Sequence, residues 1–271
     1  MSYTPTKSDK NRLRRKGRSD VDIEFWTALK VNAPDIAQSD ELVAPIAKNV
    51  LDGRELAYIK ENFGNLVVNI ESDVNSEYQR REKKATARAL TATMMGDLGS
   101  AASIEDVCNY LSERVHGLDE YFLSVKQSRS SRAGNALERI LEHLLYRLGY
   151  KFEAHPVVDG NPDWIFPSKQ HYLNNPMECI VFTAKRTLRE RWRQVTTEAA
   201  KGSSFFLGTI EDKFSTTQLG EMKDLRIQLV VPEDAKTLAP YDTASNVISY
   251  ASFVCDYLDP KHEVWRRSGI I

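Results

Sequence analysis

The spacing of apolar residues divides the chain into two parts of different character. From residue 20 to about residue 117, apolar side chains recur at helical spacing, beginning with Val21, Phe25, Trp26 and Leu29. This spacing is typical of amphipathic helices. Ser103, followed three residues later by an acid, predicts a further capped helix that runs to about residue 115. We therefore predict an all-helical N-terminal region over residues 20–125.

A short basic and polar segment, residues 126–134, precedes a different pattern. We place a domain boundary there, followed by a leucine-rich helix over about residues 132–148, which Gly149 ends. Beyond it, short apolar runs predict strands and amphipathic stretches predict helices. The predicted strands are 150–154, 163–166, 179–183, 205–207 and 227–231, and the predicted helices are 188–200, 216–222 and 244–258. This order predicts an α/β domain over residues 126–271, with a mixed central sheet flanked by helices.

The composition suits a soluble globular protein, since 41% of the 271 residues are hydrophobic and 28% are charged. The formal net charge of −1 argues neither for nor against nucleic acid, because an acidic metal site can offset a basic cleft. The three cysteines lie far apart without a CxxC pair, which fits a reducing cytoplasm. No apolar run approaches the roughly 18 residues of a membrane helix, and the first residues do not resemble a signal peptide.

Residues 1–19 are rich in lysine and arginine and poor in apolar side chains. This composition predicts a flexible basic arm. Two roles remain open for it: a solvated tail, or an arm that contacts the DNA backbone.

Two charged residues stand at the ends of consecutive predicted strands. Asp163 begins one apolar strand, beside Trp164, and Lys185 ends the next. A partly buried carboxylate needs a partner, and a metal ion is suited to it; a turn aspartate that caps the strand is the alternative. Lys185 can orient or help to deprotonate an attacking water, or stabilise charge on a phosphate. Such a pair can hold a divalent metal and a water beside a phosphodiester, as a nuclease requires.

This candidate site lacks one carboxylate, because Thr183 stands where many metal nucleases have an acid. Glu198 lies on the predicted helix 188–200, on the side that carries apolar residues, and can supply the missing carboxylate. Glu138, on the helix before the sheet, can bind the metal through water or contact the scissile phosphate. For Glu142, one turn further on, an exposed helix acid is the favoured interpretation.

The basic residues after Lys185 can read or hold DNA. Arg189 and Arg191 can each donate two hydrogen bonds to a guanine, and Glu190 can accept one from cytosine. Alternating charges on a helix are more often a solvated face, so this motif alone is not decisive. The candidate contacts to the DNA backbone are Arg129, Arg132, Arg186 and Arg193.

Taken together, these residues resemble type II restriction endonucleases of the PD-(D/E)XK superfamily. The similar branch cuts CCGG, CCNGG or CCWGG sites and includes the EcoRII C-terminal domain, PspGI, NgoMIV and BsaWI-like enzymes. Its pattern is Pro-Asp, about 20 residues, Ser/Thr-x-Lys, three residues, Arg-(Asp/Glu)-Arg and then Glu. The corresponding segments here are Pro162-Asp163, Thr183-Ala184-Lys185, Arg189-Glu190-Arg191 and Glu198. The resemblance covers about residues 126–232, and Glu138 matches a glutamate of the EcoRII-like helix.

The resemblance implies a mechanism. Asp163 and Glu198 would hold one or two Mg²⁺ ions, and Lys185 would assist the attacking water. The products would carry 5′-phosphate and 3′-hydroxyl ends, with 5′ overhangs. Arg189 and Arg191 would each take a guanine, and Glu190 would bridge the neighbouring cytosines. A palindromic site implies a homodimer or a higher homo-oligomer on double-stranded DNA, in the cytoplasm of a prokaryote.

Three alternatives stay open at this stage. A repair or junction-resolving nuclease of the same fold would share Asp163 and Lys185 but would not need base-reading arginines. A non-catalytic DNA-binding module would have structural acids only. In a globular protein unrelated to nucleic acid, Lys185 would simply reach water from the end of its strand.

Overall fold

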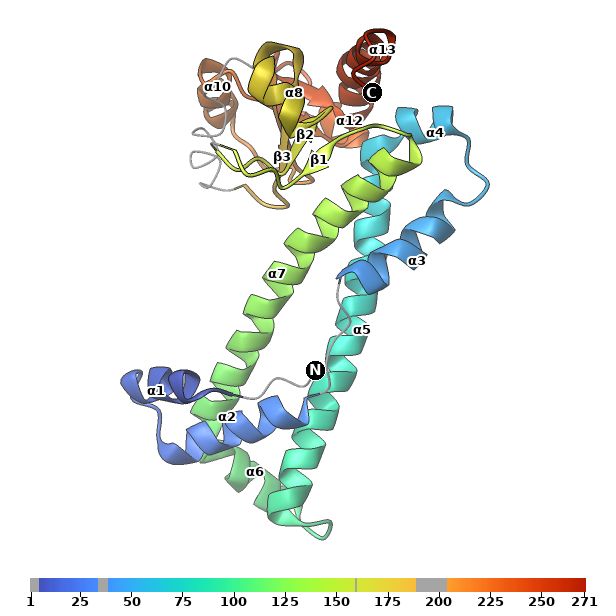
Figure 1. Cartoon of the computed structure of the whole chain (residues 1–271). Helices are drawn as coiled ribbons and strands as arrows, with labels where there is room; N and C mark the ends of the chain where they lie inside the picture. Colours follow the sequence, from blue (N-terminus) through green and yellow to red (C-terminus); the bar gives the residue numbers. More distant parts are fainter. Residues whose placement is uncertain (1–4, 34–38, 159, 189–203) are drawn as a thin grey trace. The chain divides into compact units, whose positions relative to one another are not determined.

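The computed structural model describes residues 5–33, 39–158, 160–188 and 204–271. It divides into two compact units. The helical unit comprises Met1–Gln38 and Asn75–Ala133, and the sheet unit comprises Ser39–Val74 and Gly134–Ile271. Two long helices, α5 (Phe63–Leu98) and α7 (Val115–Arg147), each contribute to both units (Figure 1).

In the helical unit, α1 (Lys7–Arg15), α2 (Asp20–Asn32) and α6 (Ile104–Ser112) accompany parts of α5 and α7. The predicted cap of α6 is confirmed, since the Ser103 hydroxyl accepts from the Asp106 amide and the Asp106 carboxylate accepts from the Ser103 amide. Such a capping box satisfies amide groups that a helix start otherwise leaves unpaired. The buried residues of this unit's core are Leu13, Ile23, Phe25, Trp26, Leu29, Ala89, Tyr110 and Tyr121.

The basic N-terminal segment differs from the predicted flexible arm, because residues 7–15 form helix α1. A capping box between Thr6 and Asp9 starts this helix, and Leu13 is buried in the core of the helical unit. Just beyond α1, Lys16 and Arg18 both donate to the buried carboxylate of Glu120, each at 2.9 Å. One apolar anchor and two ion pairs therefore order a segment whose composition alone resembles that of a solvated tail.

The sheet unit is built on a six-stranded mixed sheet with the order β1-β2-β3-β4-β5-β6. β1–β2 and β2–β3 pair antiparallel, and β3–β4, β4–β5 and β5–β6 pair parallel. The strands are β1 (Glu153–Ala154), β2 (Trp164–Phe166), β3 (Ile180–Ala184), β4 (Ser204–Gly208), β5 (Gln228–Val231) and β6 (Val247–Ser249). The predicted mixed α/β core with an all-helical N-terminal region is thus confirmed.

The sheet unit also contains short helices (Figure 1). α3 (Ser39–Leu51) and α4 (Leu56–Glu61) precede the strands. Between strands lie α8 (Lys169–Asn174), η1 (Pro176–Glu178), α10 (Thr216–Asp224) and α11 (Glu233–Lys236). After β6 follow α12 (Tyr250–Ser252), η2 (Phe253–Leu258, a π-helix) and α13 (Asp259–Arg267). In the part of the chain that the structure describes, no helix combines the length and apolar character needed to span a membrane.

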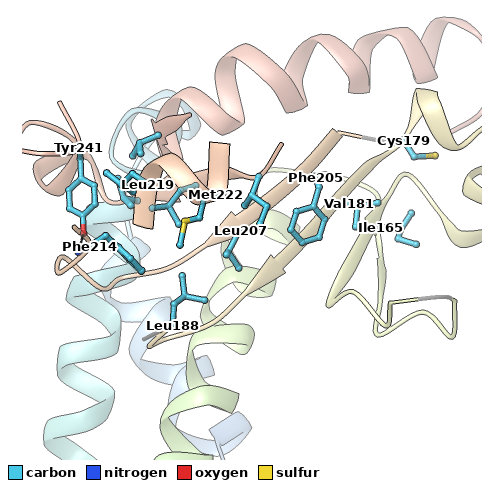
Figure 2. Packing of buried hydrophobic residues seen from close by; sticks show 14 of the residues in the cluster. Ile165, Cys179, Val181, Leu188, Phe205, Leu207, Phe214, Leu219, Met222 and Tyr241 are labelled. Carbon is cyan, nitrogen blue, oxygen red and sulfur yellow. Dashed lines mark hydrogen bonds between the residues drawn. The ribbon is translucent and has the colours of Figure 1, made fainter. Parts of the chain in front are cut away.

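Alternate residues of each strand point to opposite faces of the sheet, and other elements cover both faces. On one face, Val181 and Leu207 pack with Leu219 and Met222 of α10 (Figure 2). On the other, the rings of Phe182 and Phe206 lie 4.8 and 4.9 Å from that of Phe253. Burial of both faces also explains why β3 and β5 are nearly continuous apolar runs. A strand with one solvent-exposed face would alternate apolar and polar residues.

Two element predictions differ from the structure. The predicted helix 244–258 is instead β6 followed by α12 and η2. The predicted boundary segment 126–134 contains the division between the two units, at Ala133 and Gly134, but it lies inside the helix α7, and residues 39–74 cluster with the sheet. Alanine, arginine and glutamine have good helix propensity, which outweighs one glycine and several serines. The predicted helix 188–200 falls almost wholly outside the described residues.

Candidate functional site

The antiparallel pairing of β2 with β3 brings the two predicted catalytic residues together. Trp164 lies opposite Phe182 in the register. One position further along, the Asp163 amide donates to the Thr183 hydroxyl at 3.4 Å. Asp163 therefore stands at the start of β2, next to the end of β3, where Lys185 follows. The two short apolar runs in the sequence were thus sufficient to predict that these residues adjoin consecutive strands.

The Asp163 carboxylate is held by three hydrogen bonds from β3 and the residue after it. Oδ2 accepts from the Ala184 amide at 2.8 Å and from Lys185 Nζ at 2.9 Å, and Oδ1 accepts from the same Nζ at 3.2 Å. Asp163 is only 7% exposed. Since an unpaired buried carboxylate is costly, these contacts offset the cost of burying this side chain.

Glu138 of α7 shares this environment. Its carboxylate lies 3.6 Å from Nε2 of His155, and the His155 amide donates to the Asp163 carbonyl at 2.7 Å. Burial, and then the negative charge of Asp163, raise the pKa of Glu138; Lys185 and His155 act in the opposite direction. A buried carboxyl group whose ionisation is opposed by a neighbouring negative charge favours an added positive charge nearby.

The described residues are compatible with a divalent cation but do not complete a ligand set. Asp163 and Glu138 supply hard carboxylate oxygens, which Mg²⁺ prefers, and a cation would offset the charge repulsion that raises the pKa of Glu138. Within residues 5–33, 39–158, 160–188 and 204–271, no group of three His, Cys, Asp or Glu side chains is placed to hold a metal. Glu198, the second predicted ligand, lies outside the described residues, as do Arg189, Glu190, Arg191 and Arg193.

The three described arginines predicted to contact DNA each meet a carboxylate of their own unit. Arg186 Nε donates to Glu71 at 2.7 Å in the sheet unit. In the helical unit, Arg132 donates to Glu82 at 2.9 Å and Arg129 also pairs with it. The side chain of Arg132 is 14% exposed and that of Arg129 is 52% exposed, so Arg129 offers far more of its surface to solvent.

Sequence reasoning was wrong about Glu142, which is buried rather than exposed. Its carboxylate accepts from the Trp164 indole at 3.4 Å and from Arg139 at 2.7 Å. The signal available in the sequence was its place within the leucine-rich run of the helix, where a position inside an apolar stripe favours burial. Glu142 therefore supports the strand that carries Asp163.

The arrangement of sheet and helices is that of the restriction endonuclease fold. The structure of metal-depleted Ecl18kI in complex with uncleaved DNA aligns with a TM-score of 0.80 over 90% of this chain and 86% of that one, at 22% sequence identity. A complex of the restriction endonuclease PspGI with substrate DNA aligns with a TM-score of 0.62 over 84% of this chain and 94% of that one, also at 22% identity.

The family model described as EcoRII C terminal matches residues 99–254. The chain therefore belongs to this family of type II restriction enzymes. It is 33% identical to EcoRII of Escherichia coli over 159 residues, which are 55% of this chain and 39% of EcoRII. It is 24% identical to SsoII of Shigella sonnei over 215 residues, 73% of this chain and 69% of SsoII. The match thus spans well under half of the length of EcoRII.

Proposed function

We propose that this chain is a type II restriction endonuclease that hydrolyses double-stranded DNA at a short palindromic site. The observation that carries the proposal is the buried Asp163 carboxylate, bound by Lys185 at 2.9 Å where β2 and β3 meet. A lysine and a buried acid held together at a sheet edge suit hydrolysis of a phosphodiester. Membership of the EcoRII C-terminal family supports the same reaction.

Asp163 and Glu198 would hold one or two Mg²⁺ ions, and Glu138 would contact the metal through water or face the scissile phosphate. When bound, the metal supplies a Lewis acid that stabilises charge on the phosphate. Lys185 would orient the attacking water and balance charge on the phosphate, and its ion pair with Asp163 supports this role. Hydrolysis would leave 5′-phosphate and 3′-hydroxyl ends, with 5′ overhangs.

Recognition would rest on the motif that follows Lys185. Arg189 and Arg191 would each donate two hydrogen bonds to a guanine, and Glu190 would accept from the paired cytosines. These contacts suit a CCGG or CC(N/W)GG core. A palindromic core requires two copies of the motif, which supports a homodimer or a higher homo-oligomer, with one active site for each strand.

The remaining arginines would hold the DNA backbone, namely Arg129, Arg132, Arg186 and Arg193. Phosphate contacts of this kind position a protein on the duplex without reading sequence. Because Arg129 is the most exposed of the described three, it is the best placed to exchange its carboxylate partner for a phosphate. We assign the catalytic function to residues 126–271 and place the enzyme in the cytoplasm of a prokaryote, in line with its bacterial relatives.

Digestion of a sequenced plasmid with the purified chain and Mg²⁺, followed by sequencing of the fragment ends, tests this function. We expect discrete cuts at one short palindrome that contains CC and GG. Random nicking would instead favour a repair or junction-type nuclease of the same fold. If the folded protein cleaves DNA in the presence of none of the divalent metals tested, a non-catalytic DNA-binding module would be supported instead.

A further inference from the structure

The chain leaves β3 and β4 at the same edge of the sheet, because these two strands are parallel. Ala184 and Gly208 are the last pair in their register, and the Lys185 amide then donates to the Gly208 carbonyl at 2.9 Å. Residues 186–188 thus run beside those that follow β4.

Side chains from the segment after β4 extend this pairing beyond the sheet. The Thr209 hydroxyl donates to the Arg186 carbonyl at 3.4 Å and accepts from the Glu211 amide at 3.1 Å. Thr209 is fully buried, and its own amide donates to the Val230 carbonyl of β5 at 3.0 Å. The segment Thr209–Glu211 is therefore fixed to the body of the sheet.

Glu211 holds the chain at Leu188, the last described residue before the Arg189-Glu190-Arg191 motif. Its Oε2 accepts from the Leu188 amide at 2.6 Å. A hydrogen bond to a carboxylate is shorter and stronger than one between neutral groups. The Leu188 side chain is completely buried in the same cluster as Leu207 and Phe214 (Figure 2). Residue 188 is thus held through both its backbone and its side chain.

We propose that Glu211 is a positioning residue for DNA recognition. By binding the Leu188 amide, it fixes the residue that immediately precedes the base-reading motif. Lys185 and Leu188 are only three residues apart. The segment between them therefore connects the proposed catalytic lysine directly to the proposed base-reading residues. This inference rests on the proposed function of that motif.

Two variants and a matched control separate this role from a general effect of charge. Glu211→Ala removes the acceptor, Glu211→Gln keeps an oxygen at the same place without the charge, and Asp212→Ala removes the exposed neighbouring acid. Equilibrium binding in Ca²⁺ is measured for a cognate duplex and for a scrambled duplex. The ratio of the two affinities gives the discrimination between specific and non-specific DNA. Exchange of the Leu188 amide hydrogen, followed by NMR, reports directly on the hydrogen bond to Glu211.

For Glu211→Ala we expect faster exchange at Leu188 and about tenfold weaker binding to the cognate duplex, with binding to the scrambled duplex unchanged. Glu211→Gln should fall between it and the wild type, and Asp212→Ala should match the wild type. A folded Glu211→Ala variant that still discriminates fully, or that loses both affinities equally, would overturn the role of Glu211. A wild-type chain that binds both duplexes alike would instead overturn the proposed function itself.

Discussion

At the residue scale, the environment of Glu138 gives it a measurable signature. Burial and the nearby charge of Asp163 raise its pKa above the ordinary value of 4.5. The folded state therefore holds this proton more tightly than the unfolded chain does. The resulting stabilisation is complete below the unfolded pKa and is lost as the pH rises through the folded pKa.

Glu138→Gln removes this pH dependence. In metal-free buffer we expect the variant to have a higher free energy of unfolding than the wild type at neutral pH. The difference should shrink as the pH falls from the raised folded pKa of Glu138 and should be gone below about 4.5. Urea denaturation at a series of pH values measures it, and Glu24→Gln, a change at an exposed glutamate, serves as the control for removal of one negative charge. A difference that grows towards acid pH would contradict this assignment.

Glu142 should matter for stability instead. Glu142→Ala leaves the buried Trp164 indole without its acceptor, which we expect to cost about 1–3 kcal/mol of unfolding free energy. Glu142→Gln keeps an acceptor and should recover part of that loss. Denaturation followed by tryptophan fluorescence tests both variants, and an unchanged midpoint for Glu142→Ala would refute the structural role.

Sequence alone could identify Asp163 and Lys185, because each adjoins an apolar strand where a charge is conspicuous. It could not identify the partners that hold the site. Trp164 and Glu142 are 22 positions apart, Leu188 and Glu211 are 23 apart, and Arg186 and Glu71 are 115 apart. Such pairs depend on how elements pack, which the spacing of residues along one element does not report.

At the scale of elements, local patterns found most strands but misjudged where helices end. Val247–Ser249 is too short a run to separate from the helical residues that follow, and only its pairing with β5 makes it a strand. Conversely, the basic and polar residues 126–134 suggested a domain boundary. The division between the two units does fall there, at Ala133 and Gly134, but inside the continuous helix α7. Pairing across the sheet therefore decides the strand, whereas the helix formers among residues 126–134 carry α7 through the serines and the glycine.

Gly134→Ala tests whether α7 is continuous in solution. An added Cβ at Gly134 meets nothing within 4 Å, so alanine should stabilise an unbroken helix by about 0.5–1 kcal/mol. Thermal or urea denaturation measures this change. A destabilised Gly134→Ala variant would indicate that the helix is interrupted at this position. Gly64→Ala is the matched contrast, because its Cβ would lie 2.7 Å from the Pro232 Cα and should destabilise the sheet unit.

At the scale of the whole molecule, a net charge of −1 means that affinity for DNA must come from local basic clusters. Helix α1 carries such a cluster. If it binds phosphates, joint replacement of Lys7, Lys10 and Arg12 by glutamine should reduce the slope of log K against log salt by up to about 0.9 for each phosphate that is no longer bound. Binding titrations at several salt concentrations measure the slope, with joint replacement of the exposed Lys83, Lys84 and Arg88 by glutamine as a matched removal of three charges from α5. An unchanged slope would leave α1 a structural element only.

The most direct test is single-turnover cleavage by the intact Lys185→Ala variant at the site found by plasmid digestion, compared with its binding of the same duplex in Ca²⁺. Lys185 is bound to Asp163 at the edge where β2 meets β3, so its loss should remove stabilisation of the reacting phosphate. We expect cleavage to fall by at least about 100-fold while cognate binding stays near the wild-type value. Cleavage at the wild-type rate by the folded variant would contradict the assignment of Asp163 and Lys185 as the catalytic centre.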